Sequence, residues 1–316
     1  MFGDEPPNPR NLLLSGRRRN FATTLRVHLV NVPAPSQFPV TALNPSATLT
    51  QAVQTHWREY LMEGMEIAIL TLSTCICGAL IYSKDSPLQD VNLSRRSQSM
   101  LMGTAIAITT FLIIRSPFGR RTGAHFNPAV TLTFFWLGRV HRWDAACYVM
   151  AHFVGAVLGV AASQQILGLR LSAAPVHYLV TLPVSNGSAV AFLGEYLLSA
   201  LLMGVVLYAS NRRRLARFAP FFVALLTVSY FAFSSSISGY SVNPARSFSF
   251  ALFAWIWQGI WIYFLGPPLG MLTAATLYIR TMGPDSVYCA KVFHDLRSVC
   301  PFLCRFQRLY QEPVNR

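Results

Sequence analysis

The sequence predicts an all-α membrane protein with six transmembrane helices and two half-helices arranged as an inverted repeat. Three observations lead to this fold class. Hydrophobic residues make up 53% of the 316-residue chain and charged residues only 12%, about half the charged share of an ordinary soluble domain. Several apolar stretches approach the roughly 20 residues that a helix needs to cross a bilayer. Finally, an Asn-Pro-Ala triplet occurs twice, each time before a shorter apolar run.

Six apolar stretches are long enough to be transmembrane helices. Basic residues concentrate before the first stretch, after the second and fourth, and in the carboxy-terminal tail, so the positive-inside rule places both termini in the cytoplasm. The net charge of +14 comes largely from these short basic segments. Because no basic stripe interleaves with exposed aromatic residues, we do not expect nucleic-acid binding. The predicted spans are Tyr60–Tyr82, Ser99–Arg115, Ala145–Leu169, Ala189–Ala209, Ala219–Ser235 and Gly259–Ile279.

Each Asn-Pro-Ala triplet predicts the start of a half-helix. Asn is a favoured N-cap, and Pro fits the first helical position because its missing N–H costs nothing there. The apolar runs that follow end at Gly138 and near Gln258. About ten residues of helix rise about 15 Å, half of a roughly 30 Å hydrocarbon core, so each half-helix reaches only the midplane. The triplets are Asn127, Pro128 and Ala129, and Asn243, Pro244 and Ala245.

Two helix N-termini that meet at the midplane favour a pore for small neutral molecules. Each presents the positive end of a helix dipole, and each Asn side chain keeps N–H donors for a polar solute. Arg246, directly after the second triplet, adds a permanent positive charge near the outer mouth. Cations therefore meet an unfavourable potential along this path.

The two halves of the chain also repeat a buried acidic residue. Glu63 lies in the first span and Glu195 in the fourth, and a half-helix follows two spans later in each half. Three full spans per half is an odd number, so the second half enters the membrane inverted. Two roles remain open for these carboxylates: acceptors for the non-helical backbone before each half-helix, or a proton relay.

Taken together, the motifs resemble the aquaporin family (major intrinsic proteins) over residues 58–280. The resemblance is carried by GAHFNPAVTL, VNPARSF and WIYFLGPPLG, together with Glu63 and Glu195. It implies passive conduction of water or other small neutral solutes through a pore in each protomer of a homotetramer. It also implies a multi-pass protein of the lipid bilayer, in the cell or plasma membrane, with no enzymatic activity and no cofactor. His125, inside the first motif, joins the two glutamates as a structural support.

The resemblance also points to an outer selectivity filter. Arg246 maps directly, Tyr240 lies three residues before the second triplet and Phe231 twelve residues before it. The second-span member is either Ile106 or Ala107. Water channels of the family usually have His at the Phe231 position and a small residue at the Tyr240 position, so this filter departs from their pattern. We expect two bulky rings beside an Arg to exclude polyols, and therefore predict water as the solute.

Other functions remain open at this point. The pore could serve glycerol, ammonia or hydrogen peroxide instead. A coupled secondary transporter would also have inverted repeats and broken helices, but it needs acidic ion sites, for which only Glu63, Glu66 and Glu195 are candidates. A structural membrane protein would keep the fold around an occluded pore. His152, in the third span, is either a buried hydrogen-bonding residue or a pH gate.

The resemblance divides the chain into three parts. Residues 1–57 form a basic amino-terminal extension on the cytoplasmic side, either disordered or lying on the membrane surface. Residues 58–280 form the channel domain, with halves at about 58–140 and 190–280 joined by the third span, and residues 281–316 form a cytoplasmic tail.

The tail contains a cluster of potential metal ligands. Cys289, His294, Cys300 and Cys304 have the spacing C-x4-H-x5-C-x3-C, which could place three thiolates and an imidazole around Zn²⁺. This spacing matches no standard zinc module closely. A structural zinc site and an unliganded or membrane-associated tail therefore both remain open.

Overall fold

The computed structural model describes residues 40–183, 187–234, 238–295 and 297–311. In these ranges the regular secondary structure is helical, apart from an isolated parallel bridge between Val40 and Cys300, and loops join the helices. The predicted all-α fold class is therefore confirmed. The expectation of disorder or membrane association in the amino-terminal extension falls largely on residues 1–39, which lie outside the described residues.

Six helices in the described ranges are long and apolar enough to cross a membrane, as the sequence predicts. These are α1 (Leu49–Tyr82), α2 (Arg95–Arg115), α5 (Arg142–Leu167), α7 (Ser188–Ser210), α8 (Ala219–Ser234) and α10 (Ile260–Met282). The shorter helices are α3 (Pro117–Thr122), α6 (Leu169–Ser172) and α11 (Arg308–Gln311). Single turns of 3-10 helix occur at η2 (Pro87–Gln89), η3 (His177–Leu179), η4 (Ala216–Phe218) and η5 (Pro284–Ser286).

Helix α1 begins well before the predicted start of the first span. Its N-terminus is a capping box: the Thr48 hydroxyl accepts from the backbone N–H of Gln51, and the Gln51 side chain accepts from the backbone N–H of Thr48. The first turns of the helix are polar, so an apolar run locates only the part beyond them. At 34 residues, α1 is about 51 Å long and exceeds the thickness of the hydrocarbon core.

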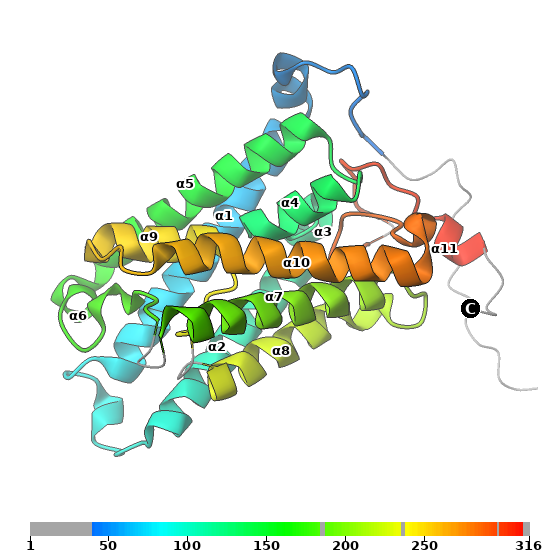
Figure 1. Ribbon diagram of the computed structural model, residues 1–316. Coiled ribbons are helices and arrows are strands. Elements are labelled where there is room, and N and C mark those ends of the chain that lie inside the picture. The colour runs from blue at the N-terminus through cyan, green and yellow to red at the C-terminus, as the bar shows by residue number, and fades with distance from the viewer. Residues whose placement is uncertain (1–39, 184–186, 235–237, 296, 312–316) are drawn as a thin grey trace, which may run out of the picture. The chain divides into compact units, whose positions relative to one another are not determined.

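The two half-helices are α4 (Pro128–Trp136) and α9 (Pro244–Ala254). Figure 1 shows them as short helices that enter from opposite ends of the bundle with their N-termini facing each other. Helix α4 packs against α5 and α10, and α9 packs against the same two helices. Both half-helices are thus held by the same two full-length helices.

Helix pairing reveals the repeat. Helix α1 packs most extensively against α5, α7 against α10, and α2 against α8. Because α5 pairs with α1 as α10 pairs with α7, the third span packs as part of the first half. Close approach depends on small residues: a Cβ at Gly155 would lie 2.0 Å from the Gly64 carbonyl oxygen, and one at Gly270 would lie 2.1 Å from that of Tyr196.

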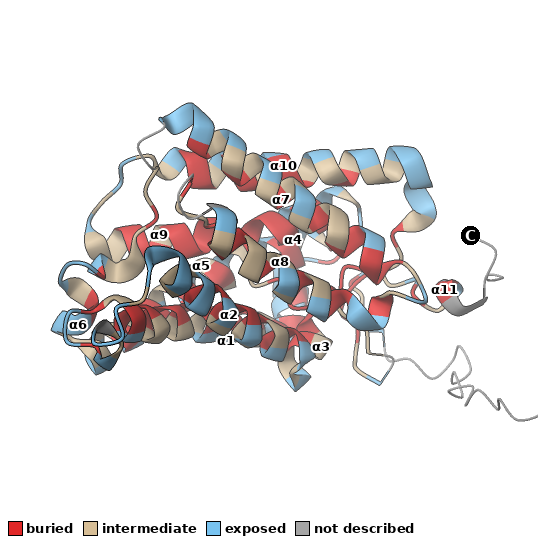
Figure 2. Ribbon diagram, turned by 90° about the horizontal axis from the view of Figure 1, so that it is seen from below, coloured by how far each residue is buried: buried red, intermediate tan, exposed pale blue. Residues whose placement is uncertain are grey.

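Burial follows the same arrangement. Figure 2 shows the buried residues on the inward faces of the helices and the exposed ones on the outward faces. Large apolar side chains are exposed there, among them Leu112, Leu158 and Leu225, as expected for surfaces that contact lipid. The segment after α10 adds buried residues to the main apolar core, including Val287, Ala290 and Phe302.

Candidate functional site

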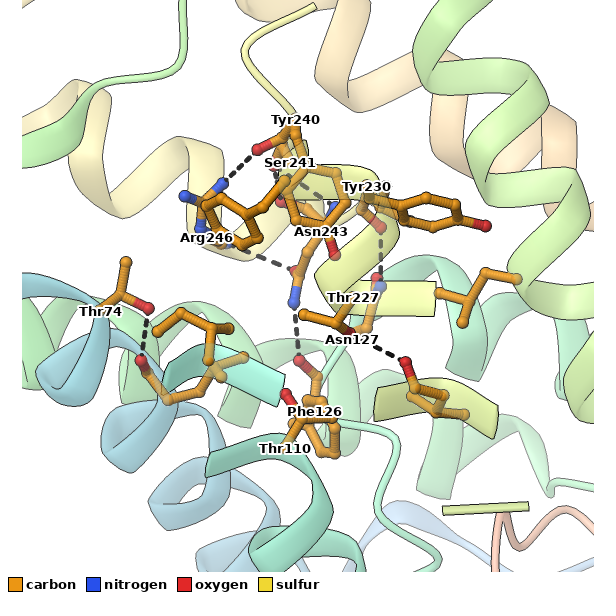
Figure 3. A pocket seen from close by; sticks show the side chains of 16 residues that line it. Thr74, Thr110, Phe126, Asn127, Thr227, Tyr230, Tyr240, Ser241, Asn243 and Arg246 are labelled. Atoms are coloured by element: carbon orange, nitrogen blue, oxygen red, sulfur yellow. Dashed lines mark hydrogen bonds between the residues drawn. The ribbon is translucent and has the colours of Figure 1, made fainter. Parts of the chain in front are cut away.

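The site forms where the two half-helices meet, and its centre is the pair of asparagines. Each caps its own helix: the Oδ1 of Asn127 and of Asn243 accepts from the backbone N–H two residues later, at 2.9 and 3.1 Å. Each also reaches across to the other half. Nδ2 of Asn127 donates to the Val242 carbonyl and Nδ2 of Asn243 donates to the Phe126 carbonyl, both at 2.8 Å (Figure 3). Since an amide nitrogen carries two hydrogens, one N–H of each asparagine remains for the cavity.

Glu63 holds the loop before the first half-helix. Its carboxylate accepts from the backbone N–H groups of His125 at 3.0 Å and Phe126 at 2.7 Å. The same carboxylate is hydrogen-bonded to Nε2 of His152 at 2.8 Å. His152 is fully buried and does not line the cavity described below. Its contact with Glu63 favours the hydrogen-bonding role over the pH gate.

Glu195 holds the second loop in the same way. It accepts from the backbone N–H groups of Ser241 at 2.9 Å and Val242 at 2.6 Å. The Ser238 hydroxyl donates a third hydrogen bond at 2.7 Å. Each buried carboxylate therefore serves two consecutive backbone donors directly before an asparagine.

Both loops need this support because their backbones are strained. Ala124 and Phe126 before the first half-helix, and Tyr240 and Val242 before the second, have φ values of 56°, 29°, 52° and 58°. These residues occupy the same positions relative to the two asparagines. A β-branched residue such as Val242 is a rare occupant of the left-handed region. Such conformations persist only where the surroundings enforce them, and the carboxylate hydrogen bonds do so here.

A cavity of about 80 Å³ lies at this meeting point (Figure 3). It is large enough for a few water molecules, since about 10–15 Å³ of such space accommodates one. Side chains of α1, α2, α7 and α8 line it together with the loops before both half-helices. Of the two predicted second-span residues, Ile106 lines the cavity, whereas Ala107 is buried outside its lining.

The other three predicted filter residues also lie at the cavity. The rings of Phe231 and Tyr240 meet edge to face with centroids 4.8 Å apart. Arg246 lines the same cavity, and one terminal nitrogen of its guanidinium donates to the Tyr240 carbonyl at 2.8 Å. The guanidinium carbon lies 5.0 Å from the ring centroid of Phe250. These contacts fix a cation beside two aromatic rings.

Sequence reasoning missed three threonines of the lining, namely Thr74, Thr110 and Thr227. The hydroxyl groups of Thr74 and Thr227 donate to the carbonyls of Leu70 and Val223, one turn back in their own helices. An isolated polar residue inside an apolar span is the signal that could have indicated them, since such residues usually face the interior of a membrane protein.

His125 lies outside the cavity lining, between the first half-helix and the carboxy-terminal segment. Its Nε2 is 2.7 Å from the Ala290 carbonyl oxygen, and its Nδ1 is 2.9 Å from the Thr131 hydroxyl. The imidazole stacks between the rings of Phe134 and Phe302, with both centroids 5.3 Å away. His125 therefore connects the half-helix to the tail.

Cys289, His294, Cys300 and Cys304, here called the tail cluster, come together in that segment. Their potential ligand atoms all lie within 4.8 Å of one another. Burial raises the pKa of the Cys289 thiol well above its usual range. Burial also opposes ionisation of Cys300, but hydrogen bonds from Cys289 and Cys304 outweigh it and lower the pKa of Cys300 well below the usual thiol range.

Comparison with known proteins identifies a matching family and similar sequences. The Major intrinsic protein family model matches residues 42–278. A probable aquaporin NIP-type from Nicotiana alata is 36% identical over 185 residues, which cover 57% of this chain and 66% of that protein. A putative aquaporin NIP4-1 from Arabidopsis thaliana is 34% identical over 186 residues, covering 58% and 64%. The matched stretch thus spans just under two thirds of the length of each of these relatives.

A solved structure shows the same fold. The X-ray structure of the aquaglyceroporin from Plasmodium falciparum matches with a TM-score of 0.59 at 18% identity, covering 73% of this chain and 98% of that chain. At this identity the likeness concerns the fold alone. The family model, however, matches well over half of the 316 residues. The chain therefore belongs to the major intrinsic protein family, whose members are membrane channels and not enzymes.

Proposed function

We propose that this channel conducts water passively through a pore in each protomer and excludes larger polar solutes at its mouth. The observation that carries this proposal is the contact between Phe231 and Tyr240 beside Arg246 in the cavity lining. These two rings, with centroids 4.8 Å apart, fill part of the cross-section of the proposed pore beside Arg246. A polyol needs a wider passage than a single file of water does.

The lining also offers the hydrogen bonds that a water molecule must find after it leaves bulk solvent. Asn127 and Asn243 each keep one amide N–H for the cavity. Arg246 uses one terminal nitrogen on protein acceptors at Tyr240 and Thr181, so other guanidinium N–H groups are available to a solute. Apolar residues such as Leu70 and Val223 line the cavity together with these donors, which keeps water from binding too tightly to move on.

Exclusion of ions follows from the same arrangement. Both half-helices direct the positive ends of their dipoles toward the meeting point. Arg246, with 9% of its surface exposed, adds a full positive charge, and none of the ion pairs in the described part of the chain involves it. A cation therefore meets repulsion where its hydration shell would have to be removed.

The orientation and assembly belong to this proposal as well. The arginines before α1, between α2 and α5 and after α7 support a cytoplasmic location for both termini. The resemblance to the family supports a homotetramer in the cell or plasma membrane. Glu63, Glu195 and His125 act in this proposal as supports of the two loops, through the contacts described above.

The test is stopped-flow light scattering on proteoliposomes under sucrose and then glycerol gradients. Wild type should shrink much faster than empty liposomes in sucrose and should admit glycerol slowly. Tyr240→Ala should admit glycerol several-fold faster, because the ring that narrows the mouth is gone. Tyr208→Ala is the matched control, since Tyr208 is 45% exposed on the outward face of α7, and it should behave as wild type.

Arg246→Ala tests the electrostatic part of the proposal in the same vesicles. Water permeability should persist, while proton or cation leak, measured with an internal pH dye under an imposed potential, should exceed that of wild type. Correctly folded wild-type protein whose vesicles shrink no faster than empty ones would contradict the proposal. A gated pore, another solute such as ammonia or hydrogen peroxide, or a structural role would then take its place.

A further inference from the structure

The tail cluster has the composition and spacing of a tetrahedral metal site. Sγ of Cys289 lies 3.5 Å from Sγ of Cys300, and Nε2 of His294 lies 3.2 Å from Sγ of Cys304. Around a tetrahedral Zn²⁺ with Zn–S bonds of about 2.3 Å, neighbouring sulfur atoms are about 3.8 Å apart. These two separations are within a few tenths of an ångström of those that the ion imposes, and all four ligand atoms lie within 4.8 Å of one another. All six cysteines of the chain have free thiols.

The donor set selects the metal. Three thiolates and one imidazole form a standard combination for structural zinc, which has four protein ligands and no open position. Thiolate ligands disfavour hard cations such as Mg²⁺ and Ca²⁺. Stacking fixes the plane of the imidazole, since the ring of His294 lies parallel to that of Phe306 with centroids 4.2 Å apart. Its Nδ1 has no hydrogen-bond partner in the described part of the chain.

Two buried cations beside the cluster form a second, independent observation. Lys291 is 1% exposed, and its ammonium donates to the backbone carbonyls of Arg120 at 2.5 Å and Val299 at 2.7 Å. Arg139 is 6% exposed, and its Nε has no hydrogen-bond partner among the described residues. Neither forms an ion pair with a carboxylate in the described part of the chain.

Buried charges need compensation, because removing them from water is costly. Three thiolates around one Zn²⁺ have a net charge of −1, so an occupied cluster supplies a buried anion next to Lys291 and Arg139. The proximity is direct: the Lys291 ammonium donates to the carbonyl of Val299, which immediately precedes Cys300. The backbone N–H of Leu303, which immediately precedes Cys304, donates to the Arg139 carbonyl at 3.2 Å.

The segment that carries the cluster is buried without the support of regular structure. Between η5 and α11, residues 287–307 contain no helix and only the isolated bridge at Cys300 among those described. Yet Cys289, Cys300 and Phe302 are at most 3% exposed. Small irregular segments of this kind commonly rely on a metal to hold their ligand loops together. The orange-to-red segment after α10 in Figure 1 is this part of the chain.

We propose that the tail cluster binds one structural Zn²⁺, which fastens the carboxy-terminal segment to the loop before the first half-helix. The contacts to this loop lie directly beside the ligands. The Ala290 carbonyl accepts a hydrogen bond from His125, and the backbone N–H of Val292 donates to the Gly123 carbonyl at 3.0 Å. A metal that fixes Cys289 therefore also fixes Ala290 and Val292, the residues whose backbones are hydrogen-bonded to His125 and Gly123 in the strained loop.

The experiment measures metal in the full-length protein, purified in detergent without chelators. Elemental analysis should find close to one zinc per protomer in wild type and in Cys147→Ser, a control at a cysteine outside the cluster. Cys300→Ser and His294→Ala should lose nearly all of it. His294→Cys should retain zinc, because four thiolates also form a closed structural site. This variant separates loss of a ligand from a general failure to fold.

A second readout does not depend on variants or on permeability. Co²⁺ exchanged into wild type should produce thiolate-to-cobalt charge-transfer bands and the visible bands of a tetrahedral ion. Stripping zinc with a chelator should increase hydrogen exchange and proteolysis within residues 283–311, and adding Zn²⁺ should restore protection. The zinc content also distinguishes this inference from the proposed function, because a chain that conducts no water can still hold the ion.

Three results would overturn the proposal. Folded wild-type protein that contains no zinc and acquires none when dialysed against Zn²⁺ has no such site. A disulfide between Cys289 and Cys300, found by mass spectrometry of protein alkylated before lysis, would assign the short Sγ–Sγ distance to redox chemistry. Iron or copper in place of zinc would identify a different centre.

Discussion

Two glutamates on α1 show that burial of a carboxylate does not by itself establish its structural role. Glu63 and Glu66 are both fully buried, less than one helical turn apart. Glu63 uses both oxygens, on the backbone N–H groups of His125 and Phe126. Glu66 accepts one hydrogen bond, from the Thr122 hydroxyl at 2.8 Å, and its other oxygen has no partner in the described part of the chain. Neighbouring residues of one type thus have different energetic roles.

This difference can be tested with matched substitutions. Glu63→Gln should destabilise the fold by about 1–3 kcal/mol, because the new amide group places a donor against a backbone donor and leaves both unsatisfied. Glu66→Gln should change stability little, since a single acceptor oxygen is enough for the Thr122 hydroxyl. Thermal unfolding of the two variants in the same detergent, followed by tryptophan fluorescence, measures the contrast. Equal losses in both variants would contradict the role assigned to Glu63.

At the level of helices, contact between pairs depends on single glycines. Gly155 on α5 and Gly270 on α10 leave no room for a Cβ, because a carbonyl oxygen of the partner helix would lie within about 2 Å of it. Gly204 on α7 lies in open space, with no heavy atom within 4 Å of an added Cβ. Glycine has no other conformational reason to be present at these helical positions. Packing alone therefore explains the first two.

The same substitution at these sites should have opposite effects. Gly155→Ala and Gly270→Ala should each cost about 1–3 kcal/mol, as overpacked helix contacts do. Gly204→Ala should be neutral or should stabilise α7 by up to about 1 kcal/mol, because alanine has the higher helix propensity. Folded yield and melting temperature in detergent provide the comparison. A loss at Gly204 equal to the others would show that the helix surface there is covered by something outside this chain.

The sequence predicted the helices well where apolar length decides, and less well where tertiary contacts decide. The half-helices follow from Asn-Pro-Ala because capping is a local property of the chain. The start of α1 at Leu49 was not predicted, because the first turns of this helix are polar. They are held instead by packing against residues such as Trp143. The burial of the tail was not predicted either. The local sequence of residues 287–307 has no signal for contact with the loop around His125, some 165 positions earlier in the chain. Pairing between distant segments is a property of the whole fold.

At the scale of the whole molecule, the two halves share hydrogen bonds and backbone conformations in the loops before their half-helices. In each, a glutamate on the first helix accepts two backbone hydrogen bonds from the loop before the half-helix. In each, residues three and one positions before the asparagine adopt positive φ. The sequence indicated this repeat through Glu63, Glu195 and the two triplets. It did not indicate that the asparagines bond across the repeat, because that requires the register between the halves.

The crossed asparagine bonds have a consequence for biosynthesis. Asn127 bonds the Val242 carbonyl, which the ribosome delivers more than a hundred residues later, so the first half enters the membrane with a midplane donor still unsatisfied. Completion of the pore is therefore a late step that both halves must share. Two chains cut after Pro183 and expressed separately should give no water permeability, while their co-expression should restore it in the vesicle assay. Activity from the first chain alone would show that one half can close the midplane without the other.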